Sequence, residues 1–187
     1  MPRRRFIFDT PDRFVADAVG QPGARAFFLQ AAKGRNVVTV ALEKAQVAVL
    51  AERLSALLEE IERRGVDLPG GTQDPTGPGL QEPLLEAFRV GTMTLAWDGA
   101  SESVLVEARA VVDEEDGSEG DDEVVEVDDD DEDGPDILRV RLDAPAARGF
   151  IAHAVEVIAA GRPPCPLCGL PLNPEGHICP RRNGYMH

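Results

Sequence analysis

Apolar and polar residues alternate along several short stretches of the chain, a pattern that predicts β-strands. In the first third, such stretches lie at residues 14–19, 25–31 and 37–42. Apolar residues then recur at steps of three and four, which predicts an amphipathic helix with one buried face. That face would consist of Val47, Leu50, Leu54, Leu57 and Ile61. Gly65 follows as a natural helix end.

The same succession of patterns returns in the second half of the chain. A two-residue turn signal separates strand-like residues 88–97 from residues 103–112, as expected of a hairpin. A further strand is predicted at residues 137–142, and Asp143 then serves as the N-cap of a second helix. The buried face of this helix is predicted to consist of Phe150, Ile151, Ala154, Val155 and Ile158.

The two strand-to-helix junctions resemble each other. Residues 37–43 and 137–143 both combine a strand with an acidic cap before an amphipathic helix. This is either an internal duplication of a unit of three strands and one helix (βββα) or a chance likeness between two similar junctions. Because neither half could cover its own sheet, we expect the halves to complete one sheet with both helices on one face. The predicted fold is α+β, a two-layer sandwich with a mostly antiparallel sheet of about six strands.

The patterns predict one domain with an appendage. A chain of 187 residues with 43% hydrophobic residues is long enough to fill one core. We expect an α+β domain at residues 1–161 and a zinc-binding knuckle at residues 162–187. Inside the domain, halves at about residues 5–65 and 86–161 would be joined by a Gly- and Pro-rich linker, residues 66–85.

Acidic residues are concentrated in one segment. Residues 113–136 contain sixteen acidic and no basic residues, whereas the rest of the chain has 18 acidic and 19 basic residues and is nearly neutral. Such a segment repels itself and has too little apolar surface to fold, so we expect a disordered insertion between two strands. It is either a solubilising insertion or an arm that mimics DNA and competes for a basic surface.

All three cysteines of the chain fall within fifteen residues, close to a histidine. Because an odd number of thiols cannot all pair, this clustering favours a metal over disulfides in a reducing cytoplasm. Two residues separate Cys165 from Cys168, which lets both sulfurs converge on one ion, and Gly169 can adopt a positive φ that turns backbone N–H groups toward sulfur. We predict that Zn²⁺ is bound by Cys165, Cys168, His177 and Cys179.

Four protein ligands leave no open position for water, so the predicted zinc is structural and not catalytic. His187 or His153 could replace His177 as the fourth ligand. His177 is favoured because a single residue separates it from Cys179. The alternative to a metal site is a group of three buried free thiols near a solvated histidine.

Arg181, Arg182 and Tyr185, which follow the cysteines, are candidate binding residues. Guanidinium groups and an aromatic ring beside a rigid knuckle suit a phosphate or a stacked base. Alternatively, the arginines neutralise the zinc centre and the tyrosine packs on the domain. We find no pattern typical of nucleophilic catalysis and no phosphate-binding glycine loop, and we therefore assign no catalytic residue. Carboxylates such as Asp9 or Glu107 remain open as catalysts.

Segments spread over nearly the full length of the chain resemble a known family. They are residues 13–15, 26–30, 40–44, 88–93 and 161–169. The last, Gly-Arg-Pro-Pro-Cys-Pro-Leu-Cys-Gly, is the most specific. On these segments the chain resembles the uncharacterised actinobacterial family known as domain of unknown function 3090. The resemblance implies a cytoplasmic actinobacterial protein with a metal knuckle at its C-terminus, and it brings no established activity or catalytic residue.

The leading functional hypothesis is a non-enzymatic, zinc-containing binding or adaptor protein. A protein partner is favoured over nucleic acid because the basic residues are not gathered into one stripe. One alternative is an enzyme, or an accessory subunit, acting on a phosphorylated small molecule in a groove between the halves; another is a nucleic-acid binder acting through the C-terminal basic tail. A cleft lined by arginines and carboxylates would favour the enzyme, and an apolar patch the adaptor.

The cellular location is predicted from the absence of membrane-spanning and signal segments in the sequence. There is no run of about eighteen apolar residues and no secretory signal at the start, so we expect a cytoplasmic protein without a membrane partner.

Overall fold

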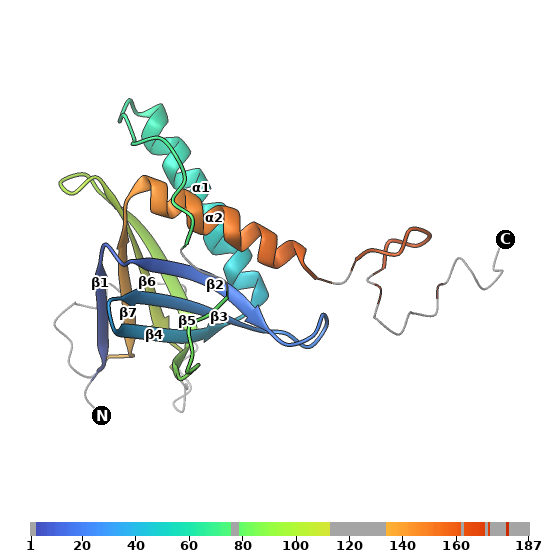
Figure 1. Cartoon of the computed structure of the whole chain (residues 1–187). Helices are drawn as coiled ribbons and strands as arrows, with labels where there is room; N and C mark the ends of the chain where they lie inside the picture. The colour runs from blue at the N-terminus through green and yellow to red at the C-terminus, as the bar shows by residue number, and fades with distance from the viewer. Residues whose placement is uncertain are drawn as a thin grey trace, which may run out of the picture.

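The protein is described by a computed structural model that covers residues 3–75, 79–112, 134–161, 163–170, 172 and 179. The described residues form seven strands and two helices in the order β1, β2, β3, β4, α1, β5, β6, β7, α2 (Figure 1). The strands are β1 (Arg5–Asp9), β2 (Arg13–Val19), β3 (Ala26–Lys33), β4 (Asn36–Leu42), β5 (Glu86–Asp98), β6 (Ser103–Ala110) and β7 (Ile137–Leu142). The helices are α1 (Lys44–Arg63) and α2 (Ala144–Ala159).

The described strands form one sheet in the order β1-β7-β6-β5-β4-β3-β2. Two pairs, β1 with β7 and β4 with β5, are parallel, and the other neighbours are antiparallel. The α+β class is confirmed. Four of the six pairings in this sheet are antiparallel, so it is mostly antiparallel as expected but mixed, and the expected number of about six strands is corrected to seven. The additional strand is β1, which pairs with a strand more than a hundred residues later in the chain.

The sheet is strongly curled. Strands β1 and β2 stand at its two ends, and in a flat sheet with a spacing of about 4.8 Å they would lie about 29 Å apart. Only residues 10–12 connect them, and four residue steps span at most about 14 Å. Lys33 on β3 also donates to the carbonyl of Asp9 and to the hydroxyl of Thr10, 3.4 Å away. The two edges therefore approach each other, and β2 to β4 cross the direction of β1 and β7 (Figure 1).

The succession of three strands and one helix occurs twice, as β2-β3-β4-α1 and as β5-β6-β7-α2. Both helices begin at an acidic N-cap: the backbone N–H of Glu43 donates to Gln46 Oε1 (2.8 Å), and the Asp143 side chain accepts from the N–H of Ala146 (2.9 Å). The helices pack on each other on one side of the sheet (Figure 1). In the described part of the chain, neither is long and apolar enough to cross a bilayer.

One apolar core joins the helices to every strand of the sheet. At its centre the ring of Phe150 on α2 stacks on Phe14 of β2, with ring centroids 4.9 Å apart. The buried face of α2 differs from the predicted one, because Val155 is 55% exposed while Ala147 and Val157 are buried. On α1, Leu57 is only partly buried, and Ala51 and Leu58 complete the face instead. The predicted and observed faces of α1 share Val47, Leu50, Leu54 and Ile61, whereas the buried face of α2 is shifted by about one residue from the predicted one.

The expected linker lies between α1 and β5, and its described residues contain no helix or strand. It is nevertheless attached to the rest of the protein. Gln30 on β3, 1% exposed, donates to the carbonyl of Gln81 (3.0 Å) and accepts from its N–H (2.8 Å). Arg148 on α2 donates to the carbonyl of Pro69 (2.5 Å). The linker thus covers part of the sheet and closes over the start of α2.

The acidic segment connects β6 to β7, which are antiparallel neighbours. Residues 113–133, nearly all of the predicted disordered insertion, lie outside the described residues. Its last residue, Asp136, is described, and it pairs with Arg4 just before β1, with 2.5 Å between Arg4 Nη2 and Asp136 Oδ2. This pair joins the end of the segment to the strand that lies beside β7.

Candidate metal centre

Three cysteine sulfurs converge after the end of α2. The Sγ atoms of Cys165, Cys168 and Cys179 lie within 4.8 Å of one another, and those of Cys165 and Cys179 are 4.0 Å apart. Zn–S bonds of about 2.3 Å in a tetrahedral site place sulfurs about 3.8 Å apart, whereas a disulfide needs about 2.0 Å. All three are free thiols. The spacing therefore suits a shared metal ion, and the three cysteines could hold one.

A tight turn brings Cys165 and Cys168 together. Its last residue, Gly169, has a φ of 74°, which confirms the left-handed conformation expected of this glycine. The N–H of Gly169 donates to the carbonyl of Cys165 (2.8 Å), and the N–H of Cys165 donates to the carbonyl of Leu170 (2.7 Å). The N–H of Leu167 points at Cys165 Sγ, 3.4 Å away. Short-range backbone bonds thus fix the turn and orient one sulfur.

The environment shifts the acidity of the two thiols in opposite directions. Backbone N–H groups, first that of Cys168 and then that of Leu167, donate to Cys165 and lower its pKa. Burial raises the pKa of Cys168. Because the thiolate is the form that binds metals, Cys165 is the better prepared ligand of the two before an ion is present.

The fourth ligand is not found among the described residues. His153, one of the three candidates, lies on α2 with its Nε2 3.6 Å from Asp17 Oδ2, and it is not a member of the cysteine cluster. His177 and His187 lie outside the described residues. The choice between them rests on the sequence, where His177 is separated from Cys179 by one residue.

The other predicted binding residues, Arg181, Arg182 and Tyr185, also lie outside the described residues. Nothing in the described structure therefore bears on their proposed contact with phosphate or a base.

Comparison with known families adds to this geometry. The chain matches, over residues 6–179, the family described as "Protein of unknown function (DUF3090)". The chain belongs to the DUF3090 family. The match includes the whole sheet beyond Arg5 and all three cysteines. Neither a curated protein nor a solved structure matches the chain.

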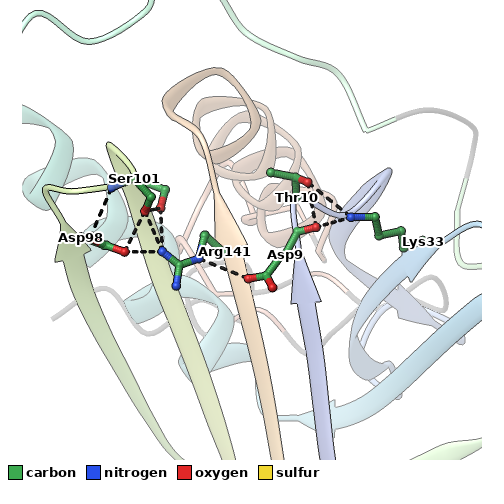
Figure 2. A network of polar contacts seen from close by, with 7 residues as sticks. Asp9, Thr10, Lys33, Asp98, Ser101 and Arg141 are labelled. Atoms are coloured by element: carbon green, nitrogen blue, oxygen red, sulfur yellow. Dashed lines mark hydrogen bonds and ion pairs between the residues drawn. The ribbon is translucent and has the colours of Figure 1, made fainter.

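This DUF3090 protein also contains a polar network that the sequence patterns did not indicate. Arg141 on β7 donates to Asp98 and Ser101 of the β5–β6 turn, with 2.6 Å to Ser101 Oγ, and to Asp9 of β1 at 3.2 Å (Figure 2). Asp98 Oδ2 also accepts from Ser101 Oγ (2.7 Å). The hydroxyl of Ser101, followed by the guanidinium of Arg141, lowers the pKa of Asp98 to about 2. The network thus attaches the turn to two neighbouring strands.

Glu107, one of the carboxylates left open as a catalyst, is 5% exposed on β6. Its Oε1 accepts from Arg109 (2.7 Å), and its Oε2 accepts from both Nε and Nη2 of Arg139 (2.9 and 2.7 Å). Each carboxylate oxygen thus already accepts a hydrogen bond from a guanidinium group. The sequence alone could not show this, because the contact with Arg139 depends on the pairing of β6 with β7. This arrangement favours a structural role for Glu107.

Charged residues line a hollow of about 280 Å³ where the two βββα units meet, at β3, β4 and β5. Its charged residues are Arg25, Glu43, Glu86 and Arg89. The guanidinium of Arg89 pairs with Glu43 (2.9 Å), and that of Arg25 donates to the carbonyl of Val157 (3.0 Å). Both arginines thus have protein partners, although their charge is available at the surface of the hollow.

A larger hollow of about 650 Å³ lies between α1 and α2, and most of its lining is apolar. Ile151, Val155 and Ile158 of α2 form one wall, and small residues of α1 form the other. We call this hollow the interhelical groove.

Proposed function

We propose that this DUF3090 protein is a zinc-containing binding or adaptor protein that presents surfaces to a partner protein and has no catalytic activity of its own. The observation that carries the proposal is the convergence of Cys165, Cys168 and Cys179 within 4.8 Å. Three thiolates are soft donors, which favour Zn²⁺ over the hard cations that oxygen ligands select.

The proposed fourth ligand, His177, would complete a closed tetrahedral site. Such a site has no position for a reactive water, so the metal would stabilise the knuckle and not activate a substrate. Three thiolates and a neutral imidazole around Zn²⁺ carry one negative charge. Arg181 and Arg182 follow Cys179 closely in sequence and would offset it.

The interhelical groove supports the adaptor part of the proposal. Large exposed apolar patches on a folded protein are typical of interaction sites. Val155 is 55% exposed inside the groove, and Leu167 and Leu170 on the cysteine turn are 51% and 49% exposed. These side chains offer apolar contacts outside the protein's own core.

Affinity capture tests this function directly. The tagged full chain and a variant without residues 113–133 are used to capture partners from an extract of the native cells. A stoichiometric protein partner retained by the wild type is the expected result. Recovery of nucleic acid alone would instead support the basic tail as a binding site, and recovery of nothing would contradict the adaptor function. Comparison of the two forms shows whether the acidic segment competes with the partner.

A second candidate function is supported by the charged hollow. Arg25 and Arg89 line it at the junction of the two halves, where a groove for a phosphorylated small molecule was expected. Calorimetric titration with inorganic phosphate tests this candidate. Binding that is lost in Arg25→Ala/Arg89→Ala but kept in Arg53→Ala, a control that does not line this hollow, would favour it over the adaptor function. No heat of binding at millimolar phosphate would dismiss it.

A further inference from the structure

One wall of the interhelical groove is an apolar face of α2 that the core covers only in part. Ile151, Val155 and Ile158 follow one another at steps of four and three along α2, which places them on one face. The fully buried face of α2 lies next to it and is formed by Ala147, Phe150, Ala154 and Val157 among others. Ile151 and Ile158 are partly buried against the core, whereas Val155, between them, is 55% exposed and free to contact a partner.

The opposite wall, on α1, consists mostly of short side chains. Ala48, Ser55 and Ala56 line the groove with short side chains, so the backbone of a third helix could come close to α1 there. A partner with small side chains would leave the groove unfilled. The volume and the apolar lining therefore suit an occupant that inserts large apolar side chains.

The charged side chains that line the groove indicate which kind of helix would bind there. Glu52 and Glu59 line the groove from α1, two turns or about 10.5 Å apart, and both are exposed. In the part of the chain that the structure describes, neither carboxylate takes part in an ion pair. The basic residues near the C-terminal end of α1, Arg63 and Arg64, pair with Glu60. Among the described residues that line it, the groove thus has two acidic groups and no basic group.

A second copy of this chain is a poor occupant for the same reason. The basic residue of α2, Arg148, is already paired with Glu62 of α1 (2.7 Å). Two copies facing each other through this groove would bring Glu52 and Glu59 of both copies together, and none of the described residues that line it is basic.

We propose that the interhelical groove binds a basic amphipathic helix of a partner protein. This inference rests on the proposed binding function. Large apolar residues of that helix, at steps of four and three, would fill the space beside Val155. Lysine or arginine residues one heptad apart would pair with Glu52 and Glu59. This is recognition of a helix in an apolar groove, with the acidic residues selecting the sign of its charge.

Fluorescence anisotropy with model peptides tests the proposal on the full chain. One labelled peptide has Leu at i, i+4, i+7 and i+11 with Lys at the flanking positions, and the second has Glu in place of each Lys. We expect the Lys peptide to bind at least tenfold more tightly than the Glu peptide. Equal binding of both peptides, or binding of neither, would overturn the proposal.

Two variants with the same net charge distinguish peptide binding at the groove from binding at the acidic segment, which could also attract a basic peptide. Glu52→Lys/Glu59→Lys should weaken binding of the Lys peptide at least tenfold. Asp67→Lys/Glu82→Lys changes the net charge equally at exposed positions outside the groove and should weaken binding less than twofold. Equal losses in both variants would place the binding elsewhere and refute the groove.

Ala56→Trp fills the groove from an exposed position, so the fold should be retained and peptide binding lost. Unchanged affinity in a variant with an unchanged melting temperature would overturn the proposal. The proposal would also be overturned if the wild type were a dimer in analytical ultracentrifugation and Ala56→Trp were a monomer, because the groove would then bind a second copy of the chain. If the native partner is captured equally by this variant, the groove proposal fails while the binding function stands.

Discussion

The α+β body, from β1 to α2, and the cysteine knuckle that follows it differ in which residues they bury. In the body, side chains of every strand and both helices meet in one apolar core. In the knuckle the buried side chains include Cys165 and Cys179, while the apolar Leu167 and Leu170 are about half exposed. A segment this short cannot bury enough apolar surface to fold by itself, so it needs a cross-link. The body should fold without metal, and the knuckle should not.

The largest expected effect separates the two regions. Cys165→Ser removes a thiolate from the proposed centre, and we expect the variant to lose its zinc, measured by mass spectrometry under native conditions as the absence of one bound ion. The melting temperature of the body should be unchanged. His153→Ala is the matched control, because His153 lies beside Asp17 and should leave the zinc in place. Loss of zinc in that control would make His153 the fourth ligand.

The converse change weakens the body and leaves the knuckle intact. Phe150→Ala opens a cavity against Phe14, and the loss should be about 3–5 kcal/mol in the free energy of unfolding. Urea denaturation measures it, with Val155→Ala as an exposed apolar control on the same helix that should change stability by less than about 0.5 kcal/mol. Zinc content should stay at one ion per chain in both. A knuckle that released its metal when Phe150 is truncated would show that the two regions are coupled.

A smaller effect tests whether polar contacts contribute to the body at all. Glu107→Ala leaves Arg109 and Arg139 without the carboxylate that both contact. Because both guanidiniums are partly exposed, we expect a loss of only about 1–2 kcal/mol, measured by urea denaturation. Glu107→Gln keeps an acceptor oxygen and should lose less. A stabilised Ala variant would mean that the ionic cluster is unfavourable and that the core alone holds the body.

The smallest effect is a pH dependence at the β5–β6 turn. The pKa of Asp98 is lowered to about 2, so the stabilisation from its charged form is present above its ordinary pKa and lost as pH falls from about 4 toward 2. NMR titration of the Asp98 carboxyl carbon measures this pKa. Ser101→Ala should raise it, because the hydroxyl is the main cause of the shift. A wild-type titration near pH 4 would contradict the contacts in Figure 2.

The sequence predicted the local elements well because periodicity and capping are local. Six strands and both helices lie where alternation and the caps Glu43 and Asp143 indicated them. It missed β1, since Arg5–Asp9 is a short edge strand whose pairing partner, β7, is fixed only in the folded sheet. The parallel pairing of β4 with β5 was missed for the same reason. Val155 was assigned to the core because a helical stripe does not state which of two faces is buried.

The candidate metal site was predictable from spacing, because two cysteines three positions apart and a left-handed Gly169 need only a few residues to converge. Other sites could not be predicted. The contact of Glu107 with Arg139 follows from strand register, and the charged and interhelical hollows follow from how strands and helices pack. A site formed by residues close in sequence could be predicted, whereas sites formed by residues distant in sequence could not.

X-ray absorption spectroscopy at the zinc edge of the purified full chain tests the proposed centre most directly. We predict one zinc per chain with three sulfur neighbours at about 2.3 Å and one nitrogen neighbour at about 2.0 Å. Protein that contains no metal while its three thiols react freely, or a zinc with an oxygen ligand at an open position, would contradict the structural site from which the proposed function begins.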